Sequence, residues 1–457
     1  MPLILGTNSI KDTGFNVANS LRFNDGSSDN LTRTFGSGDR RTFTISCWLK
    51  RSNLGADGIF HTYTNGSNYW VLEFNSSDQL VIKNITSGST NVNLITNAVF
   101  RDTASWYNFV VDTDTEETTE SSRVKLYVNG TQVTSFGTET YPSQNDDLQL
   151  NQAQSHMIGA GVASGYFDGY IAEFVFVDST SLDATSFGEF DSDSPTIWKP
   201  KDVSGLTRGT NGFYLDFKDS SNLGNDVGVN AGTDFAENNI VALDQSTDVP
   251  TNNFSILNPL IYITSAGMTL SEGNLKVVTS ADAHRNAYGT MGVSSGKWYW
   301  EINVVDTTGD HQKIGVVNED NAEINKTSPS EFSGDANGYA YRTDGQKENN
   351  DSASSYGNSY TDDDIIGVAM DLDNNKLYFS KNGTFQNSGD PTTGSTGTGS
   401  AFNLVANKTY FAAINQYGGN TSSFNFGSPP YAISSGNADA NGHGNFEYAP
   451  PSGYFAL

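Results

Sequence analysis

The chain has 457 residues, which is enough for about two or three domains that each bury a core. It carries 52 acidic and 25 basic residues, and the resulting net charge of −27 excludes nucleic-acid binding through bulk electrostatics. The single cysteine, Cys47, excludes an internal disulfide and a multi-thiolate metal site, and no apolar run reaches the roughly 18 residues that membrane insertion requires.

Aromatic residues make up 12% of the chain and 46 residues are glycine, a composition typical of an all-β protein with many turns. The N-terminus has no basic leader and too short an apolar run for a secretory signal. We therefore expect the protein to be made and folded in a cytoplasm. Residues 1–19 are polar and precede the first predicted strand, so we expect them to form an arm that docks to another subunit.

Residues 20–193 show the alternation of apolar and polar side chains that is typical of antiparallel strands. The segment 42–50 alternates without interruption, and residues 124–128 end at an Asn-Gly pair that suits a two-residue hairpin turn. Residues 170–177 are apolar on both faces apart from Glu173, which predicts a central strand. These residues are expected to form one β-sandwich.

Residues 194–262 concentrate prolines and lack sustained alternation, which predicts a connector. Residues 212–217 within it are expected to form a strand, so the connector should be ordered and packed on its neighbours. The best helix candidate lies just before it, over residues 181–190, with Ser181 as a possible N-cap.

Alternation returns over residues 263–457, where Trp298 and Trp300 share one face of a predicted strand and form a large apolar anchor. Residues 389–400 are rich in Gly, Ser and Thr and are expected to form a flexible loop. The predicted fold class is therefore all-β, with two antiparallel β-sandwiches of the jelly-roll type joined by an ordered connector, and with a C-terminal tail on the second sandwich.

Both halves resemble known domain families. The first half resembles the laminin-G-like, concanavalin-A-like lectin/glucanase jelly roll, and the segments that carry this resemblance are residues 20–24, 43–50, 104–108, 124–130 and 167–173. The second half resembles a SPRY domain, on residues 296–301, 366–371, 377–383 and 424–427.

The order of these segments, together with residues 212–217, 250–254 and 448–454, resembles a layout found in virion proteins of tailed phages of marine bacteria. The resemblance implies a non-enzymatic virion surface protein, a tail fibre or tip adhesin, that is assembled in the host cytoplasm. Its expected partners are a host-surface carbohydrate or protein and other virion subunits, and its expected state is a homotrimer. The alternatives are a structural capsid or tail decoration and a polysaccharide depolymerase.

The depolymerase alternative needs two carboxylates about 5 Å apart, because retaining glycosidases use one as nucleophile and one as acid. The nearest sequence to the usual Glu-x-Asp-x-x-Glu strand is residues 189–194, where Ser194 replaces the last glutamate. No other catalytic motif is present, so we expect no enzymatic activity.

Carbohydrate binding needs an aromatic platform with polar neighbours. Tyr69 and Trp70 follow the turn-forming residues 65–68, so we expect Asn68, Tyr69 and Trp70 to bind a ligand. The alternative is that the tryptophan belongs to the sandwich core, as most tryptophans do.

Calcium is a possible cofactor, because Asp25, Asp29 and Asp168 offer the oxygen ligands that this ion prefers. The related family often has the pattern Gly-x-Ile-Asp-Glu, and this chain has Ala172 in place of that aspartate. The alternative is that these aspartates stabilise ordinary turns.

The SPRY resemblance implies recognition through loops at one end of the sandwich. Tyr339, Tyr341 and Arg342, with the loop 349–360, are the candidates on that basis. The alternative is that the two tyrosines pack against side chains of neighbouring strands.

Overall fold

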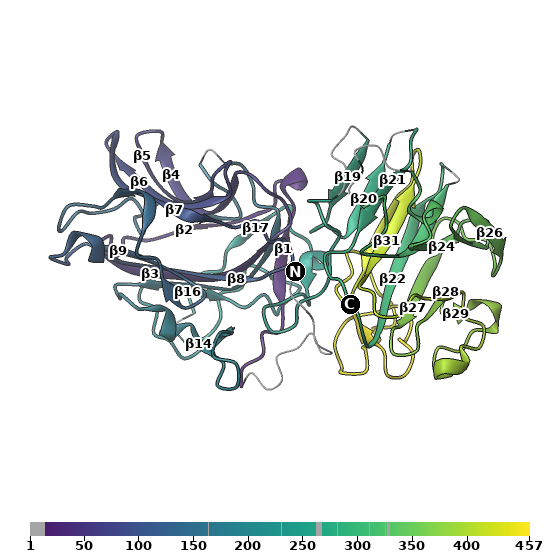
Figure 1. Ribbon diagram of the computed structural model, residues 1–457. Coiled ribbons are helices and arrows are strands. Elements are labelled where there is room, and N and C mark those ends of the chain that lie inside the picture. The colour runs from purple at the N-terminus through teal and green to yellow at the C-terminus, as the bar shows by residue number, and fades with distance from the viewer. Residues whose placement is uncertain are drawn as a thin grey trace. The chain divides into compact units, whose positions relative to one another are not determined.

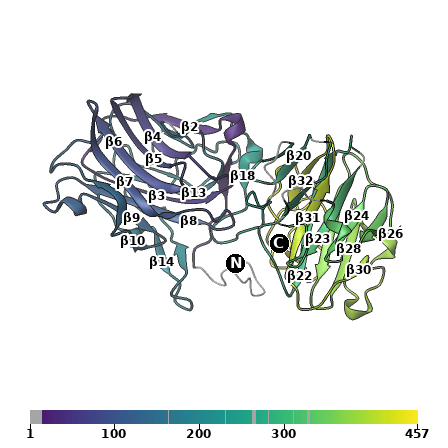
Figure 2. The same cartoon turned by 45° about the horizontal axis from the view of Figure 1, so that its top comes forward.

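A computed structural model describes residues 14–457 apart from residues 163, 230, 262–266, 281, 310, 325 and 327–329. The chain divides into two compact units, which we call the N-terminal unit, ending at Asn253, and the C-terminal unit, beginning at Phe254 (Figures 1 and 2). Both units consist of β-strands with short 3₁₀ turns, so the predicted all-β class is confirmed. Within the described residues no helix has the length and apolar character to cross a membrane.

The described residues of the N-terminal unit form two large sheets and a two-stranded one, β14-β15. The large sheets have the orders β10-β9-β8-β3-β13-β1-β18, to which β16 adds beside β13, and β11-β7-β6-β5-β4-β12-β2-β17. The strands of the first sheet are β1 (Ser20–Phe23), β3 (Thr42–Arg51), β8 (Tyr107–Asp114), β9 (Val124–Val128), β10 (Thr131–Gln132), β13 (Gly169–Asp178), β16 (Phe213–Leu215) and β18 (Gln245–Ser246). Those of the second are β2 (Asn30–Thr34), β4 (Asp57–Asn65), β5 (Asn68–Phe74), β6 (Gln79–Thr86), β7 (Ser89–Val99), β11 (Phe136–Thr140), β12 (Ser155–Ile158) and β17 (Ala236–Asn238).

The core of this unit lies between its sheets. Every second residue of β3 from Phe43 to Leu49 is apolar and is buried there, as this spacing predicts. Trp48 points to the other face of β3 and is buried in a second cluster, which the segment around Trp198 covers. Strand β13 lies between β3 and β1 and is buried throughout, which confirms its predicted central position.

The segment predicted as a connector belongs largely to the N-terminal unit. Its strand β16, at the predicted place, pairs with β13, and β17 and β18 add to β2 and β1. The compact unit therefore ends at Asn253 and not at residue 193. The helix predicted over residues 181–190 is wrong, because this stretch forms a 3₁₀ turn (Ala184–Ser186), capped by Asp183, and then strand β14 (Gly188–Phe190), which pairs with β15 (Trp198–Pro200).

The predicted N-terminal arm lies mostly outside the described residues, since residues 1–13 are not described. The part that is described packs on the N-terminal unit. Val17 is buried, and its backbone N–H donates a hydrogen bond of 3.2 Å to the hydroxyl of Thr251.

The C-terminal unit also contains two sheets, one with the order β19-β20-β32-β22-β27-β28-β29, to which β30 and β33 add, and one with the order β21-β31-β23-β24-β25-β26. The strands of the first are β19 (Met268–Ser271), β20 (Lys276–Thr279), β22 (Lys297–Asp306), β27 (Ile365–Asp371), β28 (Lys376–Lys381), β29 (Thr384–Phe385), β30 (Phe402–Asn403), β32 (Thr421–Asn425) and β33 (Phe455–Ala456). Those of the second are β21 (Arg285–Tyr288), β23 (Gln312–Asn318), β24 (Gly338–Arg342), β25 (Gln346–Asn349), β26 (Ser352–Ser355) and β31 (Tyr410–Gln416).

The C-terminal residues complete this unit. Trp298 and Trp300 are buried on β22, as predicted, and β33 pairs with the same strand in parallel. The carboxylate of Glu301 accepts hydrogen bonds of 2.9 and 2.8 Å from the backbone N–H groups of Glu447 and Tyr448. The predicted flexible loop 389–400 holds a 3₁₀ turn (Gly394–Thr396).

A β-bulge interrupts strand β13, because Glu173 and Phe174 together oppose Cys47 of β3. Glu173 has a φ of 49°, a left-handed conformation that is strained for a glutamate. Its side chain is buried, and one carboxylate oxygen accepts a hydrogen bond of 2.6 Å from the hydroxyl of Tyr214. Burial raises the pKa of Glu173 from 4.5 to about 7.

The raised pKa of Glu173 predicts that the stability of the protein depends on pH. Between pH 4.5 and about 7 the folded chain holds a proton on Glu173 that the unfolded chain has lost. The stability present at pH 4.5 therefore decreases by about 3 kcal/mol as the pH rises through 7. We expect Glu173→Gln to remove this part of the pH dependence, measured as the free energy of urea unfolding over that range. An unchanged pH dependence in the variant would contradict the assignment.

Candidate functional site

The end of the β4–β5 hairpin carries a pair of surface tyrosines. The register of the two strands places Tyr63 opposite Tyr69, and the two ring centres are 6.2 Å apart. Tyr63 is 47% exposed. The Nζ atom of Lys83, on the neighbouring strand β6, lies 6.0 Å from the centre of the Tyr69 ring.

Polar groups border this pair. The side-chain carbonyl of Asn68 accepts a hydrogen bond of 2.9 Å from the backbone N–H of Ser87, and its amide donates one of 3.2 Å to Asn65. We call Tyr63, Tyr69, Lys83 and Asn68 the tyrosine patch. Its rings can stack on the C–H faces of a sugar, while its ammonium and amide groups can bind hydroxyls.

The prediction that Trp70 forms part of this site is wrong. Trp70 is 1% exposed and packs between the sheets, with its ring edge-to-face against Phe43 at 6.4 Å and Phe60 at 6.1 Å. Successive strand residues point to opposite faces, so Tyr69 and Trp70 cannot both lie on the surface. Sequence reasoning missed Tyr63, because a regular hairpin that pairs Asn65 with Asn68 would place Thr64 opposite Tyr69. A β-bulge between Tyr63 and Asn65 shifts the register, and this shift brings Tyr63 opposite Tyr69.

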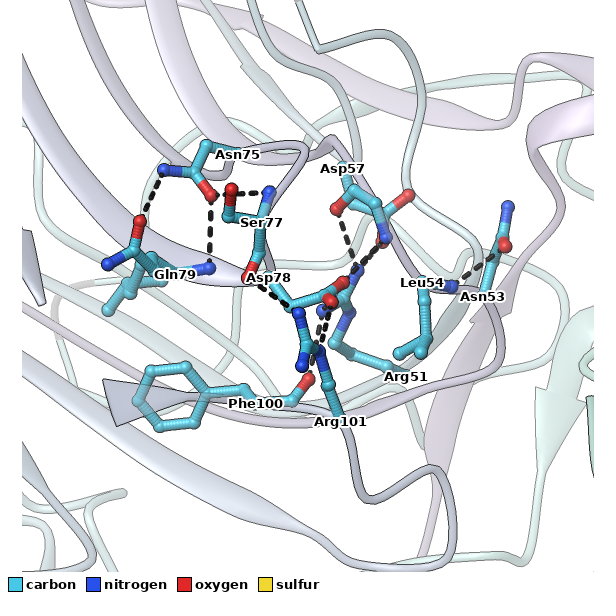
Figure 3. A network of polar contacts seen from close by, with 12 residues as sticks. Arg51, Asn53, Leu54, Asp57, Asn75, Ser77, Asp78, Gln79, Phe100 and Arg101 are labelled. Atoms are coloured by element: carbon cyan, nitrogen blue, oxygen red, sulfur yellow. Dashed lines mark hydrogen bonds and ion pairs between the residues drawn. The ribbon is translucent and has the colours of Figure 1, made fainter. Parts of the chain in front are cut away.

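Hydrogen bonds and ion pairs between charged side chains connect several loops of the N-terminal unit (Figure 3). The Arg51 guanidinium, at the end of β3, donates hydrogen bonds of 2.6 Å to Asp57, 3.2 Å to Asp78 and 2.9 Å to the Phe100 carbonyl. Arg101 donates a further one of 2.6 Å to Asp78. Burial raises the pKa of Asp57 to about 6, against the opposing charge of Arg51. Because each carboxylate already has an arginine, this network is structural.

The aspartates predicted to bind calcium do not form a ligand cluster. Asp29 is buried, and its two oxygens accept hydrogen bonds of 2.9 Å from the Asn24 backbone N–H and 2.7 Å from the Ser27 hydroxyl. Asp25 begins a 3₁₀ turn (Asp25–Ser27), as expected of a turn residue. Among the described residues, Asp25, Asp29 and Asp168 are not a group with ligand atoms within 4.8 Å of one another.

The candidate residues of the C-terminal unit are mostly packing residues. Tyr339 and Tyr341, on β24, are buried. The Tyr341 ring stacks on Phe379 at 5.4 Å, and Tyr339 packs edge-to-face on Phe402 at 5.3 Å. The interpretation of the two tyrosines as a binding surface is therefore wrong. Arg342 is half-buried and donates a hydrogen bond of 2.6 Å to Glu348.

A polar pocket of about 350 Å³ lies beside Glu348 in the same unit. It is lined by His284, Glu323, Ser330, Glu331, Gly334 and Asp351. Carboxylate oxygens of Glu331, Glu348 and Asp351 lie within 4.8 Å of one another, a spacing that would suit a metal ion.

The ammonium of Lys313 already contacts two of these three carboxylates. Its Nζ atom lies 2.6 Å from both Glu331 and Glu348, and it is buried. Burial pushes the pKa of Glu348 up, but hydrogen bonds from Lys313 and Ser333 outweigh this effect and lower the pKa. Glu331 and Glu348 are thus paired with cations of the chain itself.

Removing this ammonium should destabilise the C-terminal unit. Lys313→Met removes one of the two cations that lie 2.6 Å from the buried Glu348, and we expect the free energy of unfolding to fall by about 3 kcal/mol. The matched control is Lys408→Met at an exposed ion pair, which should leave the stability nearly unchanged. Urea unfolding measures both, and equal stability of Lys313→Met and the wild type would show that the pair contributes little.

The segment expected to come closest to a glucanase motif forms the end of β14 and the turn that follows it. The Asp191 carboxylate accepts hydrogen bonds of 2.9 Å from the backbone N–H groups of Asp193 and Ser194. Lys199 lies 3.3 Å from Asp191 and 3.5 Å from Glu189. These contacts use both carboxylates for structure.

Comparison with known proteins identifies both units. Residues 25–184 match the model of the concanavalin A-like lectin/glucanases superfamily, and residues 297–429 match that of the SPRY domain. A search of curated proteins found no significant match.

Many solved structures are similar to part of the chain. The SPRY domain of human HERC1 is 16% identical with a TM-score of 0.29, over 37% of this chain and 96% of that one. The stonustoxin structure is 19% identical with a TM-score of 0.29, over 37% of this chain and 27% of that one. The two family matches carry the conclusion that the chain has a concanavalin A-like lectin/glucanase domain followed by a SPRY domain.

Proposed function

We propose that this protein is a non-enzymatic adhesin that binds a surface carbohydrate through the tyrosine patch of its N-terminal unit. The observation that carries the proposal is the contact of exposed Tyr63 with half-buried Tyr69 at a hairpin end, with Lys83 and Asn68 beside it. Lectin-like and SPRY domains commonly bind carbohydrate or protein ligands, which agrees with this role.

The geometry of the patch suits a sugar better than a flat apolar partner. A pyranose ring offers one face of C–H groups and a circumference of hydroxyls, which complement an aromatic ring with hydrogen-bonding neighbours. Both tyrosines also keep a polar hydroxyl, and such aromatic residues dominate many binding sites. The Lys83 ammonium would favour a ligand that carries acidic groups.

The place of action in this proposal is the surface of a phage particle. It rests on the resemblance of the domain order to virion proteins of tailed phages. In this proposal the chain is assembled in the host cytoplasm as a homotrimer, and it attaches the particle to a carbohydrate or protein of the host envelope as part of a tail fibre or tip.

A second candidate function, structural decoration of the capsid or tail, is favoured by a different surface. The β14–β15 ribbon presents Phe190, 46% exposed, and the adjoining Ile197 is 39% exposed. Exposed apolar side chains on a short ribbon suit a contact with another virion subunit. Location of the protein on the particle by immunoelectron microscopy separates this role from that of a fibre adhesin.

The adhesin proposal predicts that Tyr63→Ala and Tyr69→Ala each weaken carbohydrate binding by about tenfold or more. Each variant removes one of the two rings, and neither tyrosine belongs to the buried core. The measurement is binding of the full-length chain to a glycan array and to host cells.

Tyr166→Ala is the matched control, because Tyr166 is 37% exposed outside the tyrosine patch. It should bind like the wild type. Binding that is absent from the wild type in both assays would overturn the proposal. Release of reducing sugar from host polysaccharide would show a depolymerase instead.

A further inference from the structure

A lysine, an asparagine and an aspartate meet in the interior of the N-terminal unit. Lys50 lies near the end of β3, and its side chain is 0% exposed. Its Nζ atom is 2.7 Å from the Oδ1 atom of Asn253 and 2.8 Å from the Oδ2 atom of Asp248. An amine is thus held beside an amide carbonyl, with a carboxylate in contact with the amine.

Aromatic groups enclose these polar side chains. The Lys50 Nζ atom is 5.8 Å from the centre of the buried Tyr170 ring. The indole N–H of Trp106 donates a hydrogen bond of 3.0 Å to Asp248 Oδ1. The amide of Asn253 donates one of 2.7 Å to the carbonyl of Ala104, which fixes the orientation of the amide plane.

The surroundings make it easier to remove a proton from the Lys50 ammonium. Burial lowers the pKa of Lys50, although the charge of Asp248 opposes this effect. A desolvated lysine amine with a depressed pKa is an activated nucleophile. Two reacting groups that the fold already holds in contact also react with a lower barrier, because no entropy is lost in bringing them together.

We propose that Lys50 and Asn253 form an intramolecular amide cross-link, with Asp248 as the proton acceptor. Asp248 takes one proton from the Lys50 ammonium, and the neutral amine attacks the Cγ atom of Asn253. The Nζ–Cγ bond forms and the Cγ–Nδ2 bond breaks. The second proton of the amine moves to the departing nitrogen, which leaves as ammonia, so the reaction needs no oxidant, reductant or cofactor.

The product removes a buried charge pair. The ammonium becomes a neutral amide N–H, and the protonated Asp248 can donate a hydrogen bond to the new amide carbonyl. A buried ion pair bears a large desolvation cost, and the cross-link replaces it with neutral groups that are hydrogen-bonded.

The position of the link gives it a mechanical consequence. It joins β3, which pairs with both β13 and β8, to Asn253, the last residue of the N-terminal unit. A force that arrives through the following chain would reach β3 through a covalent bond. This inference goes beyond the proposed function and does not depend on it.

Intact-mass spectrometry of the purified full-length chain tests the proposal. We expect a mass lower than that of the sequence by one molecule of ammonia, after allowance for the initiator methionine. Proteolysis should release one branched peptide that contains both Lys50 and Asn253. A full sequence mass, with the two residues in separate linear peptides, would overturn the proposal.

Three variants separate the cross-link from other reactions. Lys50→Arg and Asp248→Asn should each restore the full mass, whereas Asn253→Asp should lose one water instead of ammonia. Ammonia lost through ring closure at an Asn-Gly pair, such as residues 129–130, would persist in Lys50→Arg and contradict the proposal. The wild-type measurement decides the question even where a variant fails to fold.

The chain contains its own control pair. The Lys376 Nζ atom lies 2.5 Å from the Oδ1 atom of Asn403, and this contact is exposed to solvent. Water stabilises the charged ammonium there, so we expect these two residues in separate linear peptides. A branched peptide at this pair would show that contact alone is sufficient, and it would overturn the role assigned to Asp248 and the buried site.

Discussion

The N-terminal unit depends on the requirement that a buried cation face a carboxylate. A charge removed from water costs several kcal/mol unless a partner and hydrogen bonds compensate it. Arg22 pairs with Asp244 at 3.4 Å, Arg33 with Asp226 at 3.3 Å and Lys50 with Asp248 at 2.8 Å. In each case the cation comes from an early strand and the carboxylate from residues 226–248. These late residues are therefore a necessary part of the domain and not an attachment to it.

This requirement also marks the limit of prediction from sequence. Alternation along β3, β13 and β22 is a local property, so the strands, their buried faces and the central position of β13 could be predicted. An ion pair such as Arg22–Asp244 joins residues more than 200 positions apart, and no local pattern reports it. The prolines of the late segment indicated a connector, although its strands pair with β13, β2 and β1.

The candidate sites show the same division. Strand parity alone forbids Tyr69 and Trp70 from sharing a face, and this part of the site could be predicted from the sequence. The position of Tyr63 beside Tyr69 could not, because it depends on a β-bulge that shifts the hairpin register. The burial of Tyr341 could not be predicted either, because it depends on Phe379 from a distant strand. The contact of Lys50 with Asn253 likewise exists only in the folded chain.

Charged residues have different roles inside the protein and on its surface. The excess of acidic residues suggests a solvated, repulsive exterior, which favours solubility over any specific contact. Several of the few basic residues are instead buried, where each fixes the position of a distant segment. Because Lys313 and Arg51 are used in this way, Glu348 and Asp57 are already paired with a cation. Acidic side chains that look like metal ligands in the sequence therefore serve the fold, and in the proposed function recognition belongs to the tyrosine patch, where Lys83 supplies the charge.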